Sequence, residues 1–178
     1  MPGGFRRHRD GGLSLRLEPV EGQVIENLLG QLTRLYDDLP KGDPGLAELG
    51  ISESTEAPDD PVLARLFPDG YRDDDKASGE FRRYTEASLR DGKERDASIV
   101  LKCLAQGPDV RLDEEQAQAW LRALNDLRLA IGTRLDITED GHERFADLEF
   151  DDPVYAMYVT YDWLTQLQDS LVQCLFQR

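Results

Sequence analysis

The stretch Ala119-Trp-Leu-Arg-Ala-Leu-Asn-Asp-Leu-Arg-Leu-Ala-Ile-Gly-Thr-Arg-Leu135 decides the fold class of this chain. Just before it, the side chain of Asp113 can cap the first helical turn, and Gln116 can reach back to the backbone of Asp113. Apolar residues then recur at steps of three and four, which places them on one helix face: Ala117, Trp120, Leu121, Leu124, Leu127, Ile131 and Leu135. Such a stripe is typical of a buried helix in a bundle.

Three further segments show helical periodicity. The first follows Pro19 and has an apolar stripe of Val20, Val24, Leu28, Leu32, Leu35 and Leu39. A long segment over residues 73–105 should pack through Phe81 and Tyr84 near its start, and Gly92 favours a bend or break. The last helix begins at Asp152-Pro153 and has its own stripe. The pattern predicts an all-α, single-domain bundle of about four main helices, with a core built by the stripes of Leu28, Trp120 and Leu164.

The 178 residues suit one domain. Residues 1–12 are predicted to be a disordered basic arm, and residues 13–178 a single helical domain. Residues 40–61, rich in Pro, Gly, Ser and acids, predict a mobile acidic loop within it. Leu13, Leu15 and Leu17 alternate with polar residues, which favours a minor β pairing of residues 13–17 with Val110–Leu112.

The charge and composition exclude several kinds of partner. The formal net charge of −15 repels phosphate backbones, so direct DNA binding is disfavoured, and solubility or a basic protein partner remain as explanations. No segment approaches the length of a membrane span, and the first residues lack the apolar run of a signal peptide. Two cysteines give no disulfide framework, so we expect a cytoplasmic protein; its oligomeric state stays open.

The sequence lacks the common catalytic and metal-binding motifs, so we expect no enzyme, no metal and no cofactor. Asp126 and Asp162 are the nearest candidates for acid–base chemistry, because they are polar groups on helices that otherwise appear buried. The alternative is that each pairs with Arg128 or Arg82, or caps a neighbour. We therefore predict a polar interior cluster that comprises Arg82, Asn125, Asp126, Arg128 and Asp162.

Cys103 and Cys174 each lie near the C-terminal end of a predicted helix. If successive long helices alternate in direction, both thiols lie at the same end of the bundle. A disulfide would then be sterically feasible if the two Cα atoms come within about 7 Å. The alternative is that both are small buried hydrophobic residues, since the negative end of a helix dipole raises a thiol pKa.

Four blocks of the chain, in order, resemble an actinobacterial family of AosR-type oxidative-stress regulators: Ala64–Asp74, Glu80–Glu86, Trp120–Leu129 and Tyr161–Gln168. This family was once catalogued as a domain of unknown function, and its genes often lie near that of the ClpS adaptor. The resemblance spans about residues 13–176. It implies a cytoplasmic transcription regulator that works with a sigma factor or RNA polymerase and is switched by thiol oxidation. For this chain it implies Cys103 and Cys174 as the redox pair, although the family's switch uses cysteines close in sequence. An adaptor for Clp-dependent proteolysis is the alternative.

Overall fold

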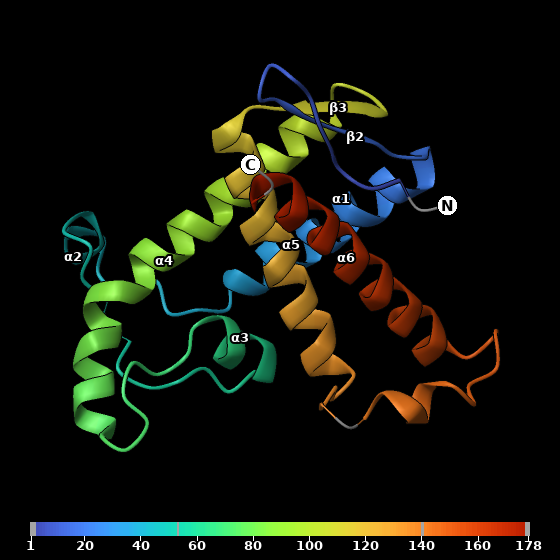
Figure 1. The fold of residues 1–178 in the computed structure, drawn as a ribbon. Helices are drawn as coiled ribbons and strands as arrows, with labels where there is room; N and C mark the ends of the chain where they lie inside the picture. The colour runs from blue at the N-terminus through green and yellow to red at the C-terminus, as the bar shows by residue number, and fades with distance from the viewer. Residues whose placement is uncertain (1–2, 53, 140, 177–178) are drawn as a thin grey trace.

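A computed structural model describes residues 3–52, 54–139 and 141–176 (Figure 1). The four long helices are α1 (Pro19–Tyr36), α4 (Asp75–Leu104), α5 (Glu114–Arg134) and α6 (Pro153–Phe176). Shorter elements connect them: α2 (Pro44–Glu48), α3 (Pro61–Leu66) and a 3-10 turn, His142–Phe145. The predicted bundle of about four main helices is confirmed. In the described part of the chain, no helix combines the length and apolar composition needed to cross a bilayer.

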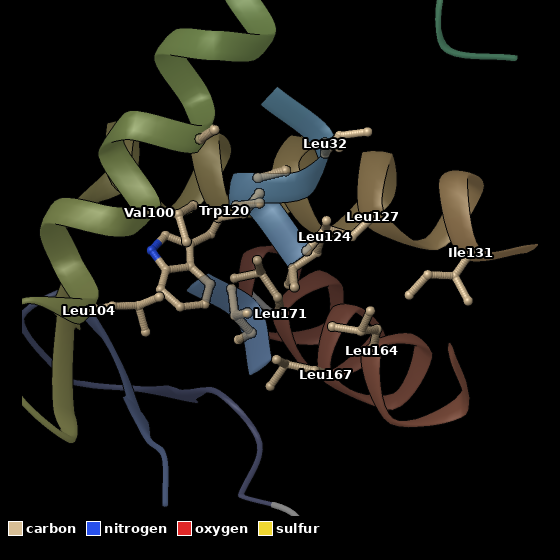
Figure 2. Close-up of a cluster of buried hydrophobic side chains, with 14 of the residues drawn as sticks. Leu32, Val100, Leu104, Trp120, Leu124, Leu127, Ile131, Leu164, Leu167 and Leu171 are labelled. Carbon is tan, nitrogen blue, oxygen red and sulfur yellow. The ribbon is translucent and has the colours of Figure 1, made fainter. Parts of the chain in front are cut away.

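Helix α5 lies at the centre of the bundle, in contact with α1, α3, α4 and α6. Its capping box forms as predicted: the Gln116 N–H donates to Asp113 Oδ1 at 2.8 Å, and the Asp113 N–H donates to Gln116 Oε1 at 2.9 Å. The stripe that begins at Trp120 is buried against α4 and α6 (Figure 2). The main core residues shown there are Leu32, Val100, Leu104, Trp120, Leu124, Leu127, Ile131, Leu164, Leu167 and Leu171.

A small antiparallel sheet closes one end of the bundle. Its strands are β1 (Arg6–Arg7), β2 (Leu13–Arg16) and β3 (Asp109–Leu112), in the order β1-β2-β3. Leu15 pairs with Val110, and both are buried. The predicted β pairing near the N-terminus is therefore confirmed, with a third strand that we did not predict.

The prediction of a disordered basic arm is wrong for residues 3–12. Phe5 is buried, and its ring contacts Trp120 edge to face with 5.7 Å between ring centroids. The Phe5 N–H donates to Ser170 Oγ at 3.0 Å, and Arg7 Nη1 donates to the Cys174 carbonyl at 3.0 Å. The Phe5 ring thus holds this segment to α5, and the two hydrogen bonds hold it to α6. Residues 1 and 2 of the predicted arm lie outside the described residues.

The predicted apolar stripe of α1 is wrong in part: Leu32 and Leu39 are buried, but the other members are not fully buried. Val20 is 65% exposed, and Leu28 is only partly buried against the core. The face that α1 buries comprises Leu32 together with Ile25, Leu29 and Tyr36, which the prediction did not include. Helix α1 therefore has two apolar faces: one is fully buried, and the other, which includes Leu28 and Leu35, is partly buried.

The first half of α4 also differs from the prediction. Phe81 and Tyr84 are exposed, whereas Arg82 and Glu86 are buried. The reason is that these two charged side chains neutralise each other inside, which leaves the aromatic rings on the outer face. The helix is continuous through Gly92 without a break, and it curves along its length (Figure 1).

The acidic segment 40–61 is partly structured. It contains α2, and its Ser52 and Ser54 are buried beside α4. The Ser52 N–H donates to the Arg83 carbonyl at 2.6 Å. The predicted mobility of this segment stays a prediction, and residue 53 lies outside the described residues.

Candidate functional site

The residues of the predicted polar cluster do not contact one another as one group. Asp126 pairs with Lys93 of α4 rather than with Arg128. Arg128 donates instead to Thr165 and Gln168 of α6. Asp162 is exposed and accepts a hydrogen bond from Gln166, one turn along the same helix.

Arg82 forms a separate buried network on α4. Its side chain is 4% exposed and donates to Glu86 Oε2 at 3.1 Å and to Asp69 Oδ1 at 2.9 Å. The Ser54 hydroxyl donates to the same Glu86 oxygen at 3.3 Å. This network joins α4 to the segments before and after α3, so its role is structural.

Two ion pairs join α4 to α5. Lys93 Nζ lies 2.7 Å from Asp126 Oδ1, and the Arg122 guanidinium makes two hydrogen bonds of 2.7 Å to the carboxylate of Asp96. Burial raises the pKa of Asp126, and the neighbouring Lys93 opposes that rise. Burial also raises the pKa of Tyr36, with a further contribution from the Asp126 charge. Lys93 and Arg122 are partners that the sequence analysis missed.

The signal for these partners was present in the charged run from Arg90 to Asp96. Its acids and bases at Lys93 and Asp96 are three residues apart, so they lie on one helix face. That face packs on α5, where Asp126 and Arg122 supply the complementary charges.

These ion pairs form the floor of a groove between α4 and α5, with a volume of about 740 Å³. Its walls include the apolar side chains of Tyr84, Leu89 and Leu121, and Asn125 also lines it. Because Lys93, Asp96, Arg122 and Asp126 neutralise one another, the groove is an apolar-walled surface with a neutral floor. Such a surface suits binding better than proton transfer, which needs a carboxylate or amine that can reach a substrate.

The structure brings both cysteines to the sheet end of the bundle, where α4 and α6 end (Figure 1). Both thiols are free and buried. Cys103 lies beside the buried side chain of Trp120, which opposes the rise in the pKa of the thiol. Cys174 Sγ lies 3.2 Å from the Phe5 carbonyl oxygen and donates to it. The Phe5–Trp120 ring contact therefore links the surroundings of the two thiols.

We expect both thiols to alkylate slowly in the native protein at neutral pH. Burial raises the pKa of Cys103 and of Cys174, so the reactive thiolate forms only at a higher pH than for an exposed cysteine. Alkylation followed by intact-mass measurement should show the rate rising through the alkaline range, and rapid modification of both thiols in denaturant. Fast native labelling at neutral pH would contradict this.

The redox pairing of Cys103 with Cys174 stays a prediction. After peroxide treatment, non-reducing mass spectrometry would detect a disulfide as the loss of two hydrogens within the monomer. The Cys103→Ser variant is the matched control, because it removes one partner and should abolish that loss. If the wild type retains two free thiols that alkylate only after denaturation, they are core residues and the pairing is wrong.

A family model described as "Domain of unknown function (DUF2017)" matches residues 2–175. The chain belongs to this DUF2017 family. Proteins named "Oxidative stress regulator AosR" from Mycobacterium tuberculosis (strain ATCC 25618 / H37Rv) and Mycobacterium bovis (strain ATCC BAA-935 / AF2122/97) are 36% identical to this chain over 177 residues, which covers 89% of this chain and 80% of each relative. A Mycobacterium leprae (strain TN) protein, also named for AosR, is 32% identical over 176 residues, or 88% of this chain and 79% of its own. The resemblance to an AosR-type family is thus confirmed. No solved structure matches this DUF2017 chain significantly.

Proposed function

We propose that this protein is a cytoplasmic, non-enzymatic regulator of the oxidative stress response that acts through contacts with a sigma factor or RNA polymerase. The names of its relatives support the regulatory role. The observation that carries the binding role is the α4–α5 groove, where Lys93 with Asp126 and Arg122 with Asp96 neutralise one another beneath exposed apolar walls. A regulator that recruits a protein needs such a surface, whereas an enzyme needs unpaired reactive groups.

The charge of the chain supports a protein partner over DNA. At −15, the surface repels a phosphate backbone and attracts basic protein regions. The two basic residues of β1, Arg6 and Arg7, belong to a strand that is held against the domain. They are therefore not a free arm for wrapping around a duplex.

The test is an affinity capture with the tagged full-length chain in a lysate of its actinobacterial host, with and without peroxide. We expect mass spectrometry to identify a sigma factor or polymerase subunits, in an amount that changes with peroxide. The Cys103→Ser/Cys174→Ser double variant is the control for a thiol-dependent change. Capture of Clp components without any transcription subunit would replace this proposal with the proteolysis adaptor.

A further inference from the structure

The charged side chains that line the α4–α5 groove are paired with one another: Lys93 with Asp126, and Arg122 with Asp96. The amide of Gln168, which α6 contributes to the groove, is also in use. Its oxygen accepts a hydrogen bond from Arg128, and its nitrogen donates to the Leu121 carbonyl at 3.5 Å. A ligand of this groove therefore meets no uncompensated charge.

Three uncharged polar side chains of the groove make no hydrogen bond within the described part of the chain: Tyr84 and Ser88 on α4, and Asn125 on α5. Asn125 is partly buried, and its amide can donate and accept at the same time. A ligand that covers the groove excludes water from this amide. It must therefore supply both an acceptor and a donor, or leave a polar group unsatisfied, which weakens binding.

An extended peptide backbone supplies this pair of groups. Along the edge of a strand, each backbone N–H and C=O is free to bind a neighbour. In the interior of a helix the same groups are already bonded to each other, so a helix offers only its side chains. Because the walls of the groove include Leu89 and Leu121, and its charges are neutralised, the side chains of the segment should be apolar and uncharged.

Gly92 leaves room for such a segment. It lies in the interior of α4, where glycine is less favourable than alanine, and it lines the groove. A Cβ atom at this position would have no heavy atom of another element within 4 Å, so packing does not require a glycine here. From Tyr84 to Asp96 the groove follows α4 for about 18 Å, which matches about five residues of extended chain.

We propose that the α4–α5 groove binds an extended, apolar and uncharged segment of the partner protein, and that the Asn125 amide pairs with the backbone of this segment. The inference rests on the proposed function, and it specifies the conformation and the chemistry of what the groove binds. Recognition of an extended segment through its backbone is common at the edges of sheets. In this helical groove, a side-chain amide takes the place of the sheet edge.

The probe is a peptide of about six residues that alternates valine and threonine and has acetylated and amidated ends, so it is uncharged and favours an extended backbone. Its matched control has the same side chains and methyl groups on the backbone nitrogens, which removes the donors. We expect the first peptide to bind with a Kd of about 100 μM order, with little effect of salt, and the methylated peptide to bind at least about tenfold more weakly. Equal binding of the two peptides, or no binding of the first, would overturn the inference.

Asn125 is its own reporter of the site. The chain has one other asparagine, Asn27, which is exposed on α1 and lies outside the groove. Selective nitrogen-15 labelling of asparagine therefore gives the side-chain amide signals of two residues, and Asn125→Leu assigns them. The peptide should shift the Asn125 amide signal and leave that of Asn27 in place. An unchanged Asn125 signal at saturating peptide would show that the amide does not contact the ligand.

Asn125→Leu and Asn27→Leu make the same substitution on different surfaces. We expect Asn125→Leu to weaken the peptide about fivefold, the effect of about one hydrogen bond, and Asn27→Leu to leave its Kd within about twofold. Methylation of the peptide should cost Asn125→Leu less affinity than it costs the wild type, because both changes remove the same hydrogen bond. Equal costs would contradict backbone recognition by Asn125. Circular dichroism melts should show that both variants fold.

The affinity capture separates this inference from the proposed function. Gly92→Leu fills the groove, and Gly30→Leu makes the same change on α1, where a Cβ would have only the Arg34 side chain within 4 Å. Loss of the transcription subunits with Gly92→Leu, but not with Gly30→Leu, supports both proposals. Undiminished capture by Gly92→Leu would overturn the inference and leave the proposed function standing.

Two further outcomes are decisive. If the wild type captures no transcription subunit, the proposed function fails, and the peptide experiments alone then decide whether the groove binds extended segments. A helical peptide of alanine and leucine that binds the wild type more tightly than the valine–threonine peptide, and that Gly92→Leu excludes, would identify a helix as the occupant and overturn the inference.

Discussion

Replacement of Trp120 by alanine is expected to lower the free energy of unfolding by about 3–5 kcal/mol, the range for removal of a buried aromatic side chain. Trp120 is fully buried, between α4 residues such as Val100 and Leu104 and the core of α6 (Figure 2). Its ring also contacts Phe5 with 5.7 Å between centroids. Removal of the indole therefore leaves a cavity and also loosens the N-terminal strand.

A urea titration measures this loss, followed by the fluorescence of the remaining Trp163. The matched control is Trp163→Ala, followed through Trp120. Trp163 is only partly buried, in a hollow beside Val20 and Val159, so the same deletion should reduce the free energy of unfolding less. Equal losses for the two variants would mean that Trp120 is not the centre of the core.

Replacement of Arg82 by methionine is expected to destabilise the fold by about 3–5 kcal/mol, because removal of one partner of a buried ion pair leaves the other charge uncompensated. Arg82 and Glu86 are each 4% exposed, and their contact is 3.1 Å. Methionine retains much of the side-chain volume, so the loss reports the charge rather than a cavity.

Two controls isolate this effect in thermal or urea unfolding. The double variant Arg82→Met/Glu86→Leu replaces the pair with apolar side chains and should recover most of the stability. Arg16→Met breaks an exposed pair with Asp109, whose side chains are 78% and 71% exposed, and should cost less than about 1 kcal/mol. If Arg82→Met costs no more than Arg16→Met, the buried network does not stabilise the fold.

The sequence predicted the parts of the fold in which one pattern dominated. Helix α5 has a single apolar stripe and a complete capping box, so its bounds and its buried face followed directly. Helix α1 has two apolar stripes, and both Leu28 and Leu29 satisfy a helical spacing. Periodicity alone cannot choose between them, because the choice depends on where α4 and α5 pack.

The other errors in the predicted fold and site concern residues whose contacts lie far away in the sequence or depend on a single buried ion pair. Phe5 stands alone among basic and glycine residues, so nothing in its neighbourhood predicted that Trp120 and Ser170 would hold it. In α4, the aromatic pattern of Phe81 and Tyr84 favoured burial. The Arg82–Glu86 pair reversed that preference because each side chain satisfies the charge of the other. The candidate site was missed for the same reason: Lys93 and Arg122 find their partners across helices, at separations that no local pattern encodes.

The contact between the first strand and the last helix sets an order of assembly during synthesis. Phe5 leaves the ribosome before Ser170 and Cys174, whose side chains form hydrogen bonds with its backbone. The N-terminal strand therefore cannot pack on α6 until Ser170 and Cys174 have been synthesised. Contacts between residues so far apart in the sequence slow folding. Because Phe5 lies beside Ser170 and Cys174, a short peptide linker could join these two segments and a chain break could be placed in the 40–61 segment without loss of the core.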